Sequence, residues 1–204
     1  SVVELLSPRA HDKGLELALT VDPQLQRTLI GDEARIRQIL LNLLSNAVKF
    51  TDRGGIAVSL TARRPEGSEG HLAVAMTVED SGIGLSPDDM QRLFMEFEQA
   101  DTPQRRQQGG TGLGLAISKR LAQAMKGDIR VSSTPGRGSV FVAEIVLREA
   151  APDDLADSGA PVALDDRLTV LVAMDHAFER RSITHILRSA SQNVIEVEAA
   201  DALA

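Results

Sequence analysis

The stretch "NLLSNAVKF", residues 42–50, places an apolar stripe and a polar face on one helix. The stripe recurs at spacings of three and four from Asp32 onward, as in an amphipathic helix, through Ile36, Ile39, Leu40, Leu43, Leu44, Ala47 and Val48. Asn42, Asn46 and Lys49 lie at i, i+4 and i+7, so they share a second face, offset from that stripe. Asparagine is unfavourable inside a helix, because its amide competes for backbone hydrogen bonds. The polar face is therefore either a binding wall suited to Mg²⁺ and phosphate, or a solvated surface with incidental asparagines.

The residues on both sides of this helix predict further strands and helices. Alternating apolar residues predict strands at 15–21, 56–60 and 72–80. The inward residues of the third strand are Leu72, Val74, Met76 and Val78. "DIRVSST" and "SVFVAEIVL" predict a hairpin around residues 135–138. A short helix is predicted to start at Ser86, with its buried side formed by Met90, Leu93, Phe94 and Phe97. A longer helix is predicted to stop at Gly127 and carries Leu113, Ile117, Leu121 and Met125.

The turn "EDSGIGLS", residues 79–86, places Asp80 where a buried strand ends. A carboxylate only accepts hydrogen bonds, so it can bind the exocyclic amine of adenine, whereas guanine would present a second acceptor there. Gly82 and Gly84 would let a flat base lie close to the backbone. The same Asp-Ser-Gly sequence is also common turn chemistry, so both interpretations stand at this point.

The stretch "GGTGLGLAI", residues 109–117, runs into the longer helix. Gly110, Gly112 and Gly114, with Thr111, place backbone donors at a helix start, which attracts anions. Their spacing fits neither the dinucleotide fingerprint nor the Walker loop. Two basic residues just upstream, Arg105 and Arg106, either reach over a triphosphate or form a solvated pair on a loop.

Composition excludes several classes of protein. The net charge of -7 argues against a general nucleic-acid surface. The chain has no cysteine, which excludes disulfides and thiolate metal sites. No apolar run approaches the roughly 20 residues of a membrane span, so we expect no membrane contact by these 204 residues. Because the chain starts without methionine, we expect it to be part of a longer protein, which could be anchored in the inner membrane. The absence of cysteine is compatible with the cytoplasmic location that we expect for this part.

The composition changes near residue 148. Residues 149–166 hold six acids, two prolines and no basic residue, which predicts an acidic flexible linker. Residues 167–204 then follow a strand–helix–strand pattern. We therefore divide the chain into residues 1–148, a linker at 149–166 and a short segment at 167–204.

Four ordered motifs resemble those of one family. The asparagine helix, the Asp-x-Gly-x-Gly turn, the Phe94/Phe97 segment and the glycine-rich helix start resemble the N, G1, F and G2 boxes. These boxes define the ATP-binding catalytic domain of bacterial sensor histidine kinases, within the superfamily of gyrase, chaperone and mismatch-repair ATPases. Residues 31–51 and the "FMEFEQAD" stretch look especially like hybrid sensor kinases. The resemblance implies a two-layer α/β sandwich of the Bergerat type, with a mixed sheet covered by helices.

The resemblance also implies a role for each matching residue. Asn46 would coordinate Mg²⁺, Asn42 would support it, and Lys49 would touch the phosphates of ATP, which makes these three the catalytic set. Asp80 would hold the adenine amine, assisted by Ser139, and residues 95–111 would form a lid. The implied ATP-binding set is Asn46, Lys49, Phe50, Asp80, Gly82, Gly84, Phe94, Phe97, Arg105, Arg106, Gly110, Thr111, Gly112, Leu113, Gly114 and Ser139.

The implied reaction is phosphotransfer to a histidine. Hydrolytic relatives carry a glutamate base where this chain has Asn42, and an amide cannot accept a proton usefully near neutral pH. None of the histidines lies in an H-E-x-x-x-P-type box (His11, His71, His176 and His185). The acceptor is therefore expected on a dimerising helical hairpin that precedes residue 1. Two alternatives are a nucleotide-sensing module without phosphotransfer and a gyrase-like hydrolase.

Residues 167–204 resemble the first third of a receiver domain. Receivers usually place two adjacent acids after the first strand, whereas this chain has Met174-Asp175, which puts that metal site in doubt. The expected downstream partner is a receiver domain or a response regulator.

Overall fold

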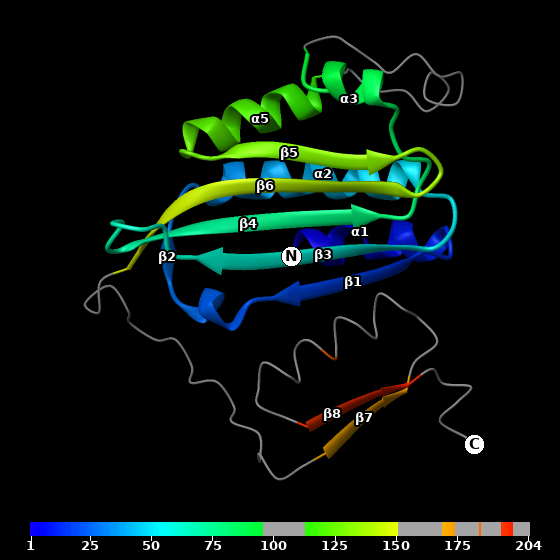
Figure 1. Ribbon diagram of the computed structural model, residues 1–204, viewed down its shortest axis with the longest axis horizontal. Coiled ribbons are helices and arrows are strands. Elements are labelled where there is room, and N and C mark those ends of the chain that lie inside the picture. Colours follow the sequence, from blue (N-terminus) through cyan, green and yellow to red (C-terminus); the bar gives the residue numbers. More distant parts are fainter. Residues whose placement is uncertain (96–112, 151–168, 174–183, 185–192, 198–204) are drawn as a thin grey trace.

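The computed structural model describes residues 1–95, 113–150, 169–173 and 193–197, together with Thr184. Figure 1 shows the arrangement of the elements. The helices are α1 (Val2–Asp12), η1 (Pro23–Gln26), α2 (Glu33–Phe50), α3 (Pro87–Arg92) and α5 (Gly114–Ala124). The strands are β1 (Glu16–Val21), β2 (Leu29–Ile30), β3 (Gly55–Arg63), β4 (His71–Asp80), β5 (Asp128–Thr134), β6 (Gly138–Glu149), β7 (Thr169–Ala173) and β8 (Asn193–Val197). Among these helices, none is long and apolar enough to cross a membrane.

The larger sheet is mixed. Its strands run in the order β1-β3-β4-β6-β2, and β5 also pairs with β6. The β1–β3 pair is parallel, and the other pairs of this sheet are antiparallel. A parallel pair needs a crossover, which the chain supplies through α2 between these two strands. Buried residues of α1, α2 and α5 pack on the sheet in one core, so the predicted sandwich of helices on a mixed sheet is confirmed (Figure 1).

The central strand β4 forms as its alternation predicts. Leu72, Val74, Met76 and Val78 are buried against the helices, as expected. The neighbouring strands add Ile56 from β3 and Ile145 from β6 to the same layer. Full burial of an aliphatic side chain stabilises the fold by about 1.5–3 kcal/mol. Asp80 is the last residue of β4, the middle strand in the order β1-β3-β4-β6-β2, so its backbone is held by strands on both sides.

The predicted amphipathic helix is α2. Asp32 caps it by accepting a hydrogen bond from the Arg35 amide at 3.2 Å. Ile39, Leu43 and Leu44 are buried most completely, as the stripe predicts. The stripe therefore holds α2 on the sheet and turns the face of Asn42, Asn46 and Lys49 sideways, where all three are half-buried.

The α5 helix differs in two details from its sequence pattern. Ile117 belongs to the predicted apolar stripe but is 40% exposed, because α5 packs through the small residues Ala116, Ser118 and Ala122. α5 ends at Ala124, three residues before the predicted stop at Gly127, and Lys126 rather than the glycine adopts the left-handed conformation, at φ 60°. Gly127 is required for another reason, since a Cβ there would lie 1.7 Å from the Glu144 carbonyl oxygen of β6.

Two other local predictions can be compared with the structure. Ser86 caps α3 by accepting a hydrogen bond from the Asp89 amide at 3.1 Å, and the helix begins at Pro87. Met90, Leu93 and Phe94, which were expected on the buried side of this helix, are half-buried rather than buried, and the latter two follow the end of α3. Phe97 lies outside the described residues. The α1 helix was not anticipated, yet a capping box between Ser1 and Glu4 starts it.

The C-terminal strands form a separate two-stranded sheet. β7 and β8 pair in parallel, as a strand–helix–strand unit requires. They fall within the two strands predicted for residues 167–204. The predicted helix between these two strands lies, apart from Thr184, outside the described residues, as do residues 151–166 of the predicted linker. β6 runs two residues beyond the predicted Leu147 and ends at Glu149.

Candidate functional site

The candidate site is built around Asp80 at the end of β4. Its side chain is only 7% exposed, and its Oδ1 accepts a hydrogen bond from the Gly82 amide at 2.8 Å. This turn holds the carboxylate in one orientation before any ligand arrives. Burial of a carboxylate is costly unless it is hydrogen-bonded, so the turn also offsets part of the cost of placing it there.

Ser139 lies directly opposite Asp80 in the register of β4 and β6. Its hydroxyl is 3.0 Å from Ser133 Oγ, which also lies 2.8 Å from the Gly138 carbonyl oxygen. Ser133 accepts a hydrogen bond from the Leu85 amide at 2.8 Å, so it ties β5 to the turn that follows Asp80. The sequence pattern missed Ser133. Its position opposite Ser139 across the predicted hairpin is the signal that could have identified it.

The two glycines of the Asp80 turn permit close backbone packing. A Cβ at Gly82 would lie 2.4 Å from the Phe50 carbonyl oxygen at the end of α2. Gly84 has φ 67°, and a Cβ there would lie 2.1 Å from the Thr134 carbonyl oxygen of β5. Both missing side chains therefore face protein backbone. This close packing brings the end of α2 and the β5–β6 turn next to Asp80.

The polar face of α2 meets the start of α5. Asn42 Nδ2 donates a hydrogen bond to Ser118 Oγ at 3.0 Å. A Cβ at Gly114 would lie 2.3 Å from Asn42 Oδ1, so α5 approaches this asparagine as closely as glycine allows. The structure thus brings together Asn42 and the first residue of α5, which the sequence assigned to two different motifs. The buried Ser118 was not predicted.

Lys49 and Phe50 form the last turn of α2. Lys49 Nζ lies 4.7 Å from the centre of the Phe50 ring, a cation–π distance. Partial burial lowers the pKa of Lys49 below its ordinary value, because the ammonium loses hydration. Reduced hydration also strengthens the attraction of the ammonium for a phosphate. Phe50 adds a carbonyl that accepts a hydrogen bond from the Ile83 amide at 3.3 Å, which connects this turn to the Asp80 turn.

The remaining predicted residues are only partly described. Phe94 is half-buried, and Lys119 Nζ lies 4.5 Å from the centre of its ring. Leu113 is the N-cap of α5 and makes no side-chain capping hydrogen bond. The others lie outside the described residues: Phe97, Arg105, Arg106, Gly110, Thr111 and Gly112.

The donor chemistry of the described residues fits Mg·ATP. A bound Mg²⁺ usually takes one or two protein oxygens and completes its shell with phosphates and water. The Asn46 amide is half-buried on the face of α2 that also carries Asn42 and Lys49. At the end of β4, the Asp80 carboxylate supplies an acceptor for the amine of a nucleotide base. Within the described ranges, no group of three His, Cys, Asp or Glu side chains offers a metal site made of protein ligands alone.

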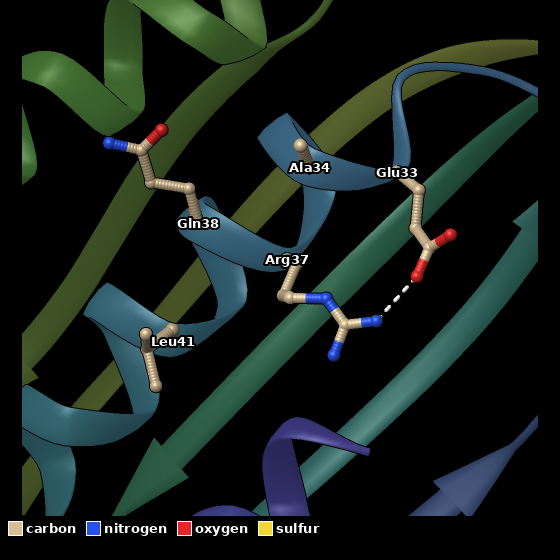
Figure 2. Close-up of a pocket in the computed structure, with 5 residues that line it drawn as sticks. All are labelled: Glu33, Ala34, Arg37, Gln38 and Leu41. Atoms are coloured by element: carbon tan, nitrogen blue, oxygen red, sulfur yellow. Dashed lines mark hydrogen bonds and ion pairs between the residues drawn. The ribbon is translucent and has the colours of Figure 1, made fainter.

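A hollow of about 480 Å³ lies on the first half of α2. Figure 2 shows its lining, with the side chains of Glu33 and Arg37 joined by an ion pair. The other lining residues are Ala34, Gln38 and Leu41. Of the predicted ATP-binding residues that the structure describes, none lines this hollow.

The fold and the site together define a class of protein. A mixed sheet backed by helices, a buried aspartate at the end of its central strand and an asparagine-bearing helix beside it are the arrangement of the Bergerat-type ATPases. Residues 31–149 match the family described as histidine kinase-, DNA gyrase B-, and HSP90-like ATPase, and the chain belongs to this family.

Within this family, the similar curated proteins include sensor histidine kinases. The sensor histidine kinase GacS of Pseudomonas protegens is 42% identical over 199 residues, which are 98% of this chain and 21% of that protein. The signal transduction histidine-protein kinase BarA of Escherichia coli strain K12 is 43% identical over 140 residues, 69% of this chain and 15% of that protein. The chain thus spans about a fifth or less of the length of these relatives.

A solved structure has a similar fold. The crystal structure of full-length ShkA in complex with AMPPNP superposes with a TM-score of 0.78 at 38% identity. The superposition covers 99% of this chain and 39% of the ShkA chain.

Proposed function

We propose that this chain is the ATP-binding catalytic domain of a hybrid sensor histidine kinase. It binds Mg·ATP and transfers the γ-phosphoryl group to a histidine on a helical hairpin of the same longer protein. The observation that carries the proposal is the buried Asp80 carboxylate, locked by the Gly82 amide beside the last turn of α2. The family match and the similarity to GacS and BarA support it.

The adenine end of the site rests on Asp80. Its carboxylate accepts a hydrogen bond from the exocyclic amine of adenine and disfavours guanine, which presents an acceptor there. Gly82 and Gly84 lie beside the base. Ser139, opposite Asp80 in the sheet, assists the carboxylate, and Phe50 lines the pocket.

The phosphate end rests on the polar face of α2. Asn46 supplies the amide oxygen for Mg²⁺, which neutralises phosphate charge when it is bound. Asn42 supports Asn46 from one turn earlier, and Lys49 contacts the phosphates with an ammonium that partial burial has made less hydrated. Catalysis then comes mainly from positioning and charge stabilisation, as in other phosphoryl transfers.

The lid of the site is assigned to residues 95–111. Arg105 and Arg106 contact the triphosphate, Phe97 belongs to the same segment, and Phe94 directly precedes it. The glycine-rich stretch closes the lid around the phosphates through Gly110, Thr111, Gly112, Leu113 and Gly114. The contact of Gly114 with Asn42 supports this placement, because it puts the start of α5 against the catalytic face of α2.

Transfer is favoured over hydrolysis at Asn42. Its amide donates to Ser118 Oγ and is not a base, so water lacks a proton acceptor at this position. In the transfer, the bond from the γ-phosphorus to the bridging oxygen breaks, a bond to an imidazole nitrogen forms, and ADP leaves. We expect very little phosphate release when this chain is incubated alone with ATP.

The rest of the chain is assigned to signalling partners. The catalytic domain is assigned to residues 1–148, the acidic linker to 149–166 and part of a receiver-like unit to 167–204. The first boundary moves by one residue, because Glu149 still belongs to β6. The parallel β7–β8 pair supports the last assignment. Dimerisation occurs through the hairpin, and the phosphoryl group passes to a receiver domain or response regulator in the cytoplasm.

Calorimetric titration with Mg·AMPPNP tests the nucleotide site. Hydrogen bonds to charged groups contribute about 1.5–3 kcal/mol, so Asp80→Asn should weaken binding by about tenfold to a hundredfold. Asn46→Asp should also weaken it, because a carboxylate in place of the amide adds charge near the phosphates. Glu66→Gln, in an exposed turn, is the matched control and should bind normally. Unchanged affinity in both site variants would refute the site.

A further inference from the structure

Lys13, the residue that follows α1, reaches the end of α2. Its Nζ donates hydrogen bonds to three backbone carbonyl oxygens, those of Val48 at 2.9 Å, Lys49 at 3.1 Å and Thr51 at 3.1 Å. Lys13 belongs to none of the motifs of the candidate site. It is 35 residues or more from its partners in sequence, so no local pattern indicates the contact.

These contacts satisfy the end of the helix. The last carbonyls of a helix lack intrahelical donors, and the helix dipole leaves partial negative charge there. The Phe50 carbonyl accepts from the Ile83 amide, and Lys13 donates to the carbonyls on either side of it. A cation at this position is favourable for both reasons. The C-terminus of α2 is therefore closed by one backbone amide and one ammonium.

The two groups come from segments far apart in the sequence. Ile83 belongs to the Asp80 turn, whereas Lys13 belongs to the segment that joins α1 to β1. The turn between them carries the Lys49 ammonium and the Phe50 ring. Lys13 thus fixes from the α1 side the backbone whose side chains face the nucleotide in the proposed function.

We propose that Lys13 is a positioning residue, which holds the last turn of α2 and couples its side chains to α1. The inference rests on the proposed function, because it assigns Lys49 and Phe50 to the nucleotide. Its structural basis is the three carbonyl contacts of Lys13. The ion pair with Asp52, at 3.6 Å, contributes little, since that carboxylate is 77% exposed.

The coupling follows from the attachment of α1. Val2, Leu6 and Ala10 pack into the core, and the helix ends directly before Lys13. A displacement of α1 must therefore break the contacts of Lys13 or move the last turn of α2 with it. Movement of the segment that precedes β1 in this way alters the geometry of the phosphate end of the site.

The test uses the full 204-residue chain and four variants. Lys13→Met removes the ammonium and keeps most of the side chain, while Lys13→Arg retains a cation with several donors. Asp52→Asn removes the ion pair alone. Arg63→Met removes a cation from a surface ion pair with Glu144. Arg63 ends β3, roughly 26 Å from Gly55 at the start of that strand, at 3.3 Å per residue. Each variant is titrated with Mg·AMPPNP at a temperature at which circular dichroism shows it folded.

Lys13→Met should weaken nucleotide binding by about fivefold or more, the lower end of coupling between linked sites. Lys13→Arg should restore most of the affinity, and the Asp52 and Arg63 variants should bind normally. Amide exchange at Thr51, whose N–H donates to the Ala47 carbonyl, should be faster in Lys13→Met. If that variant fails to fold, Lys13→Gln replaces it under the same criterion.

Three other results would overturn the inference, its assigned cause or the proposed function. Normal affinity in Lys13→Met, with or without a lower melting temperature, overturns the inference alone and leaves Lys13 a structural cap. Equal losses in Lys13→Met and Asp52→Asn assign the effect to the ion pair and overturn the carbonyl contacts as its cause. Absence of binding by the unsubstituted chain overturns the proposed function, and the inference with it.

Discussion

Gly84 and Gly136 form a matched pair for testing why the Asp80 turn has its sequence. Both glycines have left-handed backbones, at φ 67° and φ 74°, and their turns are joined by the Gly136 amide, which donates to the Ile83 carbonyl at 2.8 Å. A Cβ at Gly84 would lie 2.1 Å from the Thr134 carbonyl oxygen, whereas a Cβ at Gly136 would meet nothing within 4 Å. The two alanine substitutions thus share the backbone cost and differ in packing.

The magnitudes follow from these geometries. A left-handed conformation costs an L-residue about 1–2 kcal/mol, and the stiffer unfolded chain of the variant returns about 0.4–1 kcal/mol. Gly136→Ala should therefore destabilise by about 1 kcal/mol. Gly84→Ala adds overlap with backbone that cannot rotate away, which costs about 1–3 kcal/mol more. Its total of about 3 kcal/mol corresponds to a melting temperature lower by roughly 6–12 °C.

Urea unfolding followed by circular dichroism measures both variants. We expect equal denaturant dependence, and a midpoint for Gly84→Ala well below that of Gly136→Ala. Nucleotide affinity should fall only in Gly84→Ala, because its turn carries Asp80. Equal stability of the two variants would refute the close packing of Gly84 against β5.

Two further predictions concern contacts away from the turn. Ser118→Ala removes the acceptor of Asn42 Nδ2 and should lower the free energy of unfolding by about 1 kcal/mol in urea; an unchanged midpoint would contradict that hydrogen bond. Glu149→Gln tests how stability depends on pH in acid. The hydrogen bond from Arg64, followed by the one from Arg27, lowers the pKa of Glu149 below its ordinary value of 4.5. A lowered carboxyl pKa stabilises the fold above the ordinary value and the effect is lost as pH falls through the folded-state value. The unsubstituted chain should therefore lose stability more steeply below about pH 4.5 than the variant. If the free energy of unfolding falls equally with pH in both proteins, the contacts of Arg64 and Arg27 with Glu149 do not stabilise the fold.

The sheet and α2 were predictable because their signals are periodic. Leu72 to Val78 alternate on β4, and the stripe from Ile39 to Val48 repeats on α2, so burial of one face explains both patterns. Ile117 shows where this reasoning fails. A helix that packs through alanine and serine carries its contact in small residues, which hydrophobic periodicity does not register.

The candidate site was predictable as a set of residues but not as a set of contacts. Asp80 and the asparagine face have distinctive chemistry at fixed spacing, so the sequence alone indicates them as candidates. Lys13 contacts carbonyls 35 residues or more away in the chain, which no local pattern indicates. Ser133 is nearer in sequence to its partner Ser139, and the register of the β5–β6 hairpin places the two opposite each other. The need for glycine at position 127 also depends on a distant contact, because a side chain there would overlap the backbone of Glu144 in β6.

Phosphotransfer to the hairpin tests the central claim most directly. The chain is mixed with the separately produced helical hairpin of its longer protein and with ATP labelled at the γ-phosphate. The account predicts an acid-labile, alkali-stable label on the histidine of the hairpin, which becomes much weaker at the same ATP concentration when the Asp80→Asn variant replaces the unsubstituted chain. A chain that binds Mg·AMPPNP but leaves the hairpin unlabelled would contradict the claim and favour a nucleotide-sensing module instead.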